Sequence, residues 1–210
     1  MIKIFICDDH ALTREGLSRL FSLEIDLELV GESSNPNDLL DFIQNNECDV
    51  IVLDISFPGK SGLDVLKDIK AIKPDVKVLI LSMYPEEQFA KRTLKSGAMG
   101  YLNKESAPEE IINAVRKIAG GRKYISESLA EKLAFDLDDN SIKKPHELLS
   151  DREFQVLQLI SSGKIAKEIA EELNLGITTV STYRSRILQK LNLKSNADII
   201  RYAFLNNLIE

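Results

Sequence analysis

The sequence predicts two domains: an α/β domain built on a five-stranded, doubly wound parallel sheet, followed by an all-α domain of four short helices. Three observations predict this class. The 210 residues suit two small domains. Five short apolar runs alternate with helical patterns in residues 1–119, and only helical patterns follow residue 147. Hydrophobic residues make up 44% and charged residues 29% of the chain, as in soluble globular proteins, which argues against a disordered chain.

Five runs rich in isoleucine, valine and leucine have the length and composition of strands that are buried on both faces. Helical spacing of apolar residues follows each run, as with Leu63, Leu66 and Ile69 after the third. Strands that alternate with such helices imply right-handed crossovers and a parallel sheet, here with five β-α units over residues 1–119. The expected strands are residues 2–7, 27–32, 49–54, 77–82 and 99–104.

The next stretch, residues 120–146, has the composition of a linker. It begins with two glycines, later turns polar and charged, and has Pro145 near its end. Within it, Leu129, Leu133 and Leu137 have the spacing of a short helix. We therefore place the second domain at residues 147–210.

The sequence predicts neither a signal peptide nor a membrane span. The N-terminus is apolar for only a few residues, and no run approaches the roughly 18 apolar residues that a span requires. Cys7 and Cys48 lie in strand-like runs without Cys-x-x-Cys spacing, which favours two reduced thiols over a metal or redox role. We expect a cytoplasmic protein.

In the second domain, two helices flank a tight turn. Residues 165–173 form the first, amphipathic helix, and Asn174-Leu175-Gly176 supplies a turn with a permissive glycine. Thr178 is the expected N-cap of the next helix. The pattern is typical of a helix-turn-helix whose second helix enters the major groove of DNA, although an ordinary helical hairpin has the same pattern.

The distribution of charge favours the DNA-binding alternative. The net charge is −6, but residues 146–210 hold eight basic and eight acidic residues, so the whole excess lies on residues 1–145. Residues 173–197 carry four basic residues and no acidic one. Binding to phosphates needs a local basic face rather than a basic total, so the acidic chain does not exclude a nucleic-acid partner.

Three carboxylates follow strands of the predicted sheet. Asp8 and Asp9 end the first run, and Asp54 ends the third. If those strands are neighbours, as in the flavodoxin-like order 2-1-3-4-5, the carboxylates meet at the edge where such sheets bind ligands. Like charges raise one another's pKa, and Mg²⁺ relieves the repulsion because it prefers oxygen ligands. His10 follows the acid pair but is a poorer ligand for this ion.

Two more polar residues end the fourth and fifth strands, and with them the set becomes typical of a phosphoryl-transfer site. Ser82 can donate a hydrogen bond to a phosphoryl oxygen, and Lys104 can neutralise an anion. Asp54 is the natural nucleophile, because an aspartyl phosphate is a known type of covalent intermediate.

These residues resemble the receiver domain of two-component response regulators over roughly residues 1–119. The resemblance includes Pro58-Gly59, Gly62 and the run Gly97-Ala98-x-Gly100-Tyr101-Leu102-x-Lys104. It implies that Asp54 accepts a phosphoryl group from a sensor histidine kinase. It also implies a Mg²⁺ site and a switch: Asp9, Asp54 and the main-chain carbonyl of Ser56 bind the ion, Asp8 acts largely through water, and Ser82, Tyr101 and Lys104 transmit the signal.

The second domain resembles the LuxR-type helix-turn-helix, and the whole chain resembles the NarL/FixJ family of response regulators. The resemblance rests on Leu149-Ser150-x-Arg152-Glu153, Lys167-Glu168-Ile169-Ala170, Thr179-Val180 and Lys190-Leu191. It implies homodimerisation through the last helix, residues 196–208, and base contacts from Ser181, Thr182 and Ser185. We expect phosphate contacts from Lys167, Thr179, Arg186 and Lys190.

The resulting hypothesis is a transcription regulator rather than an enzyme. A histidine kinase phosphorylates Asp54 with Mg²⁺, and the protein then dimerises and binds double-stranded promoter DNA, with RNA polymerase a candidate partner. One alternative is a Mg²⁺-dependent phosphohydrolase, but such an enzyme normally has a carboxylate two residues after the nucleophile, where this chain has Ser56. The other is a DNA-binding protein whose receiver has lost phosphorylation, against which stands the presence of all the acidic, hydroxyl and amine residues of the site.

Overall fold

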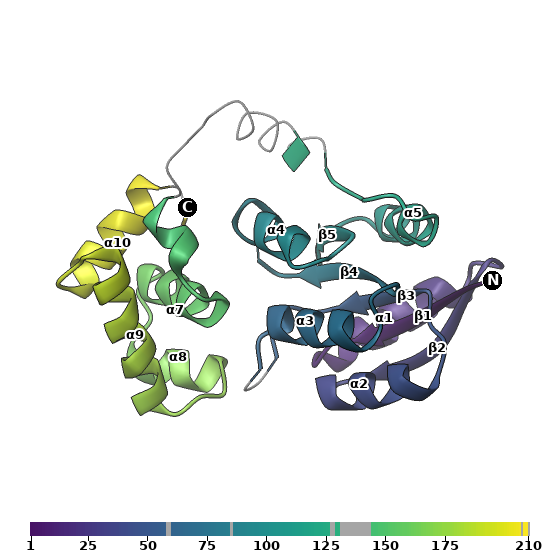
Figure 1. Ribbon diagram of the computed structural model, residues 1–210, viewed down its shortest axis with the longest axis horizontal. Coiled ribbons are helices and arrows are strands. Elements are labelled where there is room, and N and C mark those ends of the chain that lie inside the picture. The colour runs from purple at the N-terminus through teal and green to yellow at the C-terminus, as the bar shows by residue number, and fades with distance from the viewer. Residues whose placement is uncertain (58–59, 85, 127–128, 131–143, 207, 210) are drawn as a thin grey trace. The chain divides into compact units, whose positions relative to one another are not determined.

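A sheet of five parallel strands forms the centre of the N-terminal unit in this computed structural model (Figure 1). The structure describes the whole chain except residues 58–59, 85, 127–128, 131–143, 207 and 210. The strand order is β2-β1-β3-β4-β5, so the expected flavodoxin-like order is confirmed. The strands lie within one residue of their expected bounds: β1 (Ile2–Cys7), β2 (Leu27–Ser33), β3 (Val50–Leu53), β4 (Lys77–Ser82) and β5 (Gly100–Asn103).

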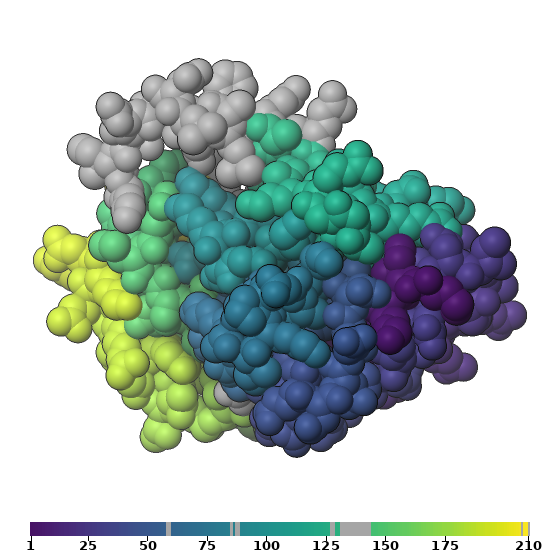
Figure 2. All heavy atoms as spheres, turned by 45° about the vertical axis from the view of Figure 1, so that its right-hand side comes forward, coloured from purple at the N-terminus to yellow at the C-terminus, as the bar shows by residue number. Residues whose placement is uncertain are grey.

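Helices cover both faces of this sheet (Figure 1). On one face, Phe21 and Val115 pack with the strand residue Val52 in a shared core. On the other face, Leu39 and Leu66 are fully buried, and the atoms around their helices form a continuous outer surface (blue in Figure 2). The helices are α1 (Ala11–Ser22), α2 (Pro36–Asn45), α3 (Gly62–Ile72), α4 (Glu86–Lys95) and α5 (Pro108–Ala119); α1 and α5 supply the first core, and α2 and α3 the second.

Strand register brings the residues after β1 and β3 to one edge of the sheet. Cys7 is paired with Leu53, and the backbone N–H of Asp54 donates to the Cys7 carbonyl at 2.9 Å. The helix that follows β3 is held at its start by Ser61, whose hydroxyl accepts a hydrogen bond from the Leu63 N–H at 3.3 Å. The loop between Asp54 and α3 is therefore anchored at both ends.

The segment after α5 stays beside the sheet and pairs with it through one short bridge. Tyr124 forms an isolated parallel bridge with Gly100, and its N–H donates to the Met99 carbonyl at 2.8 Å. A side chain at Gly100 would lie 3.0 Å from the Tyr124 carbonyl, so glycine permits this approach. A short helix was expected over Leu129, Leu133 and Leu137, but Leu133 and Leu137 lie outside the described residues. Pro58 and Gly59, which are part of the resemblance to receiver domains, also lie outside them.

The chain divides into two compact units, Met1–Phe135 and Asp136–Glu210, and the second is helical. Its first long helix begins with a capping box, in which Ser150 accepts from the Glu153 N–H and Glu153 accepts from the Ser150 N–H. Among the described residues, no helix is long and apolar enough to cross a membrane. The elements are a 3-10 helix η1 (Pro145–Leu148) and the α-helices α7 (Asp151–Ser161), α8 (Ala166–Glu172), α9 (Ile177–Leu191) and α10 (Asn196–Leu205).

The helix-turn-helix is formed by α8 and α9, and its core holds Ile169, Val180 and Ile187. The N-cap expected at Thr178 is wrong: α9 begins at Ile177 and its N-cap is Gly176. The Gly176 carbonyl accepts from the N–H groups of both Thr179 and Val180, which starts the helix two residues earlier than a cap at Thr178 would. Thr178 therefore lies within the first turn.

Candidate functional site

The three carboxylates expected to converge do so at the carboxyl ends of β1 and β3. Ligand atoms of Asp8, Asp9, His10 and Asp54 all lie within 4.8 Å of one another. Asp8 and Asp54 are each 2% exposed, and the side chain of Asp9 is 28% exposed. Neighbouring parallel strands thus bring three carboxylates into one cluster, where like charges repel one another.

The two oxygens of Asp54 have different partners. Oδ1 accepts hydrogen bonds from the Ile55 N–H at 2.6 Å and the Ser56 N–H at 3.2 Å. Oδ2 accepts from Lys104 Nζ at 2.9 Å. Burial raises the pKa of Asp54 to about 6, with Asp8 adding to the rise while Lys104 opposes it. The backbone orients the carboxylate, and Oδ2 faces the charged centre of the site.

Lys104 crosses the site and pairs with two carboxylates. Its Nζ lies 2.7 Å from Asp8 Oδ2 and 2.9 Å from Asp54 Oδ2, and its side chain is 6% exposed. Burial lowers the pKa of Lys104, but attraction to Asp54 and Asp8 and the hydrogen bonds that Lys104 donates to them outweigh burial and leave the pKa raised. Lys104 therefore stays protonated and can neutralise an anion on Asp54.

The donor set fits a hard divalent cation. Asp9 Oδ1 is buried and accepts no hydrogen bond from the described residues, although His10 Nδ1 lies 2.8 Å away without hydrogen-bond geometry. An orphaned carboxylate oxygen among converging carboxylates is what Mg²⁺ coordination would satisfy. The residues that would hold the ion are Asp9 and Asp54, with Asp8 next to them; Ser56 lies in the same loop.

Gly62 is required by the packing of the loop after Asp54. A Cβ on Gly62 would lie 2.5 Å from the Asp54 carbonyl oxygen and 2.5 Å from Ile55 Cα. Both atoms belong to the backbone, so they could not yield without moving the carboxylate. The loop is further closed by a bridge between Ser56 and Ser61.

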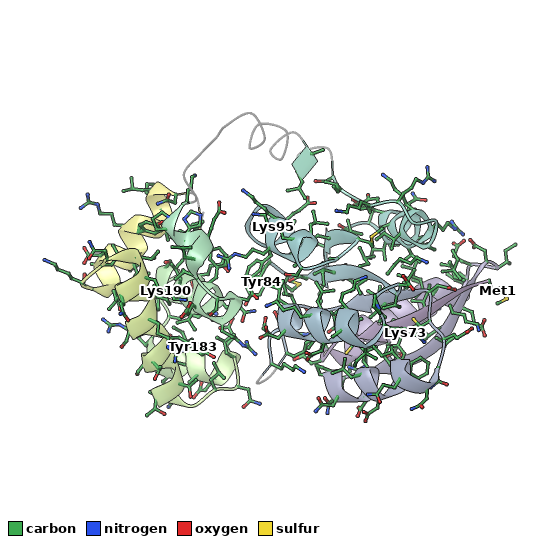
Figure 3. The ribbon with its side chains drawn as sticks, in the orientation of Figure 1. Met1, Lys73, Tyr84, Lys95, Tyr183 and Lys190 are labelled. Atoms are coloured by element: carbon green, nitrogen blue, oxygen red, sulfur yellow. The ribbon has the colours of Figure 1, made fainter. Side chains whose placement is uncertain are left out.

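Ser82 and Tyr101 meet at the β4–α4 loop. The Ser82 hydroxyl accepts from the Tyr84 N–H at 3.1 Å, and the Tyr101 hydroxyl donates to the Tyr84 carbonyl at 2.7 Å. Burial raises the pKa of Tyr101, and a side-chain hydrogen bond with Ser82 lowers it in part. Tyr84, labelled in Figure 3, thus lies between the two residues for which sequence analysis expected a switch role.

Two contacts near the site involve residues that sequence analysis missed. Arg14 donates to the Asp8 main-chain oxygen at 2.8 Å, and so supports the loop after β1. Ser126, in the segment after α5, donates to Glu86 Oε2 at 2.5 Å at the start of α4. The Arg14 contact could have been expected, because Arg14 lies in the first turns of the helix that follows Asp8. Nothing in the sequence relates Ser126 to Glu86.

On α9, the three residues expected to contact bases share one exposed face. Ser181, Thr182 and Ser185 are all exposed, while Val180 and Ile187 are buried. The Thr182 and Ser185 hydroxyls donate to main-chain oxygens four residues earlier, at 2.9 and 3.0 Å. Their oxygen lone pairs are left to accept hydrogen bonds from a ligand.

A hollow of about 320 Å³ lies beside this face, lined by Thr178, Thr179, Thr182, Tyr183 and Arg186. Hydroxyl groups and a guanidinium suit phosphate oxygens and base edges. Tyr183 and Lys190 are labelled on α9 in Figure 3.

The four residues expected to contact phosphates are not alike. Lys167, Thr179 and Arg186 are exposed, and Lys167 Nζ lies 3.9 Å from Glu171 Oε1, a loose surface pair. Lys190 instead donates to Glu153 Oε2 at 2.7 Å, within its own unit. Lys190 is exposed as well, at 39% of its side chain, so what distinguishes it from the other three is its close bond to a buried carboxylate.

The last helix has two apolar faces. Ile199 and Ala203 are fully buried and close the core of the unit. Ile200, Phe204 and Leu205 are exposed, at 39%, 67% and 68%. Closure of the core does not account for this second face, which a partner surface could cover.

Two family models match the chain and together cover most of it. Residues 4–116 match the response regulator receiver domain, and residues 147–203 match the luxR family of bacterial regulatory proteins. The response regulator UvrY of Escherichia coli K12 is 33% identical over 209 residues, covering 99% of this chain and 96% of UvrY. The oxygen regulatory protein NreC of Staphylococcus carnosus is 36% identical over 216 residues and is covered in full.

Solved structures agree with these matches. RcsB from Salmonella enterica serovar Typhimurium, bound to promoter P1flhDC in the presence of phosphomimetic BeF3⁻, aligns with a TM-score of 0.60 and 25% identity over 96% of this chain and 97% of RcsB. The response regulator ChrA of a heme-sensing two-component system aligns with a TM-score of 0.51 and 28% identity over 99% of this chain and 98% of ChrA. Both domains of the chain thus have solved counterparts.

Proposed function

This chain belongs to the NarL/FixJ family of response regulators, with a receiver domain and a LuxR-type DNA-binding domain, and on that premise we propose that phosphorylation of Asp54 controls its binding to promoter DNA. The family consists of transcription regulators rather than enzymes. The observation that carries the proposal is the pairing of Asp54 Oδ2 with Lys104 inside a cluster of carboxylates.

Asp54 is suited to accept a phosphoryl group. Its Oδ2 is the nucleophile, its Oδ1 is oriented by two backbone N–H groups, and Lys104 is at hand to neutralise the product. Mg²⁺, held by Asp9 and Asp54, would offset the charge of the transferred group. A sensor histidine kinase is the donor that the receiver domain implies.

The signal would leave the site through the β4–α4 loop. A phosphoryl group adds about −1.5 to −2 charge and three acceptor oxygens, so it attracts both Lys104 and the Ser82 hydroxyl. Ser82 would then release the Tyr84 N–H, and the Tyr101 hydroxyl bonded to the Tyr84 carbonyl would shift with the loop. The loop leads directly into α4.

The start of α4 contacts the segment that leads toward the second unit. Glu86 accepts from the Ser126 hydroxyl, and Tyr124 is bonded both to Met99 on the sheet edge and to Glu110 on α5. A change in the conformation of the β4–α4 loop would therefore alter the contacts of residues 124–126.

The output would be binding of a homodimer to double-stranded DNA. Ser181, Thr182 and Ser185 would contact bases, and Lys167, Thr179 and Arg186 would contact phosphates. The exposed side chains of Ile200, Phe204 and Leu205 on α10 would form the dimer contact. An RcsB structure contains two dimers bound to two DNAs, which supports this mode for the present chain. Contact with RNA polymerase and a cytoplasmic location are part of the same proposal.

The phosphorylation step is tested by incubating the protein with a small phosphodonor, with and without Mg²⁺, and mapping the acid-stable mass increase to a peptide. The expected result is Mg²⁺-dependent labelling of the peptide that contains Asp54. Labelling elsewhere, or none, would contradict the assignment of the phosphoacceptor. Sustained release of phosphate from phosphate esters would instead indicate a phosphohydrolase.

A further inference from the structure

Lys190 connects the end of the recognition helix to the beginning of its own domain. Its Nζ donates to Glu153 Oε2 at 2.7 Å and to the Leu148 main-chain oxygen at 3.3 Å. Glu153 belongs to the first turn of α7, and Leu148 is the last residue of η1. One ammonium group thus ties α9 to two elements that precede it by about 40 residues in sequence.

The carboxylate of Glu153 is held in place by burial and by a second hydrogen bond. Its side chain is 2% exposed, and Oε2 also accepts from the Ser150 N–H at 2.7 Å to complete the capping box. Burial raises the pKa of Glu153, but the hydrogen bonds from Lys190 and Ser150 outweigh burial and leave the pKa lowered. A buried carboxylate that keeps its charge needs its cation, so Lys190 is held by a requirement of the fold.

The position of Lys190 on α9 agrees with an internal role. It lies three residues after Ile187, which is fully buried, and side chains three apart share a helix face. Ser181, Thr182 and Ser185 lie on the exposed face. The side chain of Lys190 is 39% exposed, and its ammonium group is turned toward the junction with η1 and α7, where it donates to Glu153 and to the Leu148 carbonyl.

We propose that Lys190 is a positioning residue, which fixes the recognition helix through Glu153 and the Leu148 carbonyl, and that it does not bind a DNA phosphate. The inference rests on the proposed DNA-binding function. It assigns the phosphate contacts of α9 to Thr179 and Arg186, which line the hollow beside the base-contacting face. It also replaces our expectation from the sequence that Lys190 contacts a phosphate.

The salt dependence of DNA binding separates a positioning lysine from a contacting one. Each phosphate contact contributes about 0.9 to the slope of log K against log salt concentration, whereas a positioning residue changes affinity without changing the slope. The full-length protein would be titrated with a mixed-sequence duplex at several salt concentrations, comparing wild type with Lys190→Met, Glu153→Gln and Arg186→Met.

We expect Lys190→Met and Glu153→Gln to weaken binding by a similar factor at every salt concentration, with the slope of the wild type. The double variant should be no weaker than the worse single variant, because both remove one interaction. Lys190→Arg should restore affinity, since arginine can still pair with Glu153. Arg186→Met should make the slope less steep, by about one.

A slope lowered by about one in Lys190→Met, with Glu153→Gln unaffected, would overturn the inference and leave the proposed function standing. Absence of DNA binding in every protein, including wild type with a phosphodonor, would instead refute the proposed function. Circular dichroism melting of each variant shows that the domain is folded at the titration temperature. If Lys190→Met fails to fold, Glu153→Gln decides: affinity lowered with the slope of the wild type supports the inference, and unchanged affinity overturns it.

Discussion

Lys104 Nζ lies 2.9 Å from Asp54 Oδ2, and both side chains are almost fully buried. The same ammonium lies 2.7 Å from Asp8 Oδ2, so a single cation balances two buried carboxylates. The site therefore carries more negative charge than its own lysine neutralises. This excess of negative charge favours Mg²⁺ binding, while burial is the main cause of the raised pKa of Asp54.

Asp54→Asn should stabilise the metal-free protein at neutral pH. The pKa of Asp54 is raised to about 6 in the folded state, above the value near 3.9 of an unfolded chain. Its stabilising contribution is therefore full below about pH 4 and is lost as the pH rises through about 6. The difference in free energy of unfolding between variant and wild type should grow across this range, by at most about 3 kcal/mol. Urea denaturation with a chelator measures it, and a difference that does not change with pH would contradict the raised pKa.

Gly62→Ala should impair both stability and phosphorylation. The added Cβ would lie 2.5 Å from the Asp54 carbonyl oxygen, and relief requires movement of the backbone that holds the carboxylate. We expect a loss of about 1–3 kcal/mol in the free energy of unfolding, as for overpacked sites. Gly16→Ala is the matched control, because Gly16 lies inside α1 with nothing within 4 Å of the added atom, and it should stabilise by roughly 1 kcal/mol. Equal effects of the two substitutions on thermal unfolding and phosphorylation rate would refute this account of the loop.

Thr182→Ala should change which DNA sequences are preferred. Its hydroxyl lies on the exposed face of α9 and offers lone pairs to amino groups in the major groove. Arg186→Ala should weaken binding by a similar factor on all sequences, because phosphates carry no sequence information. Selection from a pool of randomised duplexes, followed by sequencing, measures both. If the two variants shift the preferred sequence alike, the division into base and phosphate contacts is wrong.

Ser126→Ala should weaken the link between phosphorylation and DNA binding. The substitution removes the hydrogen bond to Glu86 Oε2 at the start of α4 and leaves the site around Asp54 intact. We expect normal labelling by a phosphodonor but a smaller increase in DNA affinity on phosphorylation. Ser22→Ala, which removes an exposed hydroxyl at the end of α1, should behave as wild type. An undiminished increase in affinity for Ser126→Ala would exclude this route.

The site around Asp54 could be predicted from sequence because its residues follow a local rule. Asp8 and Asp54 end apolar runs, and the carboxyl ends of neighbouring parallel strands share an edge. The exposed face of α9 that we propose to contact bases could also be predicted, because helical spacing separates Ser181 and Ser185 from the buried Ile187.

Other features depend on contacts between residues far apart in the chain. The partner of Lys190 is Glu153, 37 positions away, and no local pattern distinguishes such a lysine from one that faces DNA. Tyr124 lies in a stretch with linker composition, yet its backbone bonds to the sheet edge at Met99. The cap expected at Thr178 was wrong because Gly176 already supplies the extended backbone that begins the helix. Contacts between distant residues decide the first two cases, and the local backbone at Gly176 decides the third.

The central claim is that a phosphoryl group on Asp54 controls the output of this protein. Its most direct test compares wild type with Asp54→Asn, each incubated with a small phosphodonor and Mg²⁺, for dimerisation by light scattering and for retention of promoter DNA. The account predicts that the phosphodonor increases both in wild type and changes neither in Asp54→Asn. Equal behaviour of the two proteins would contradict it.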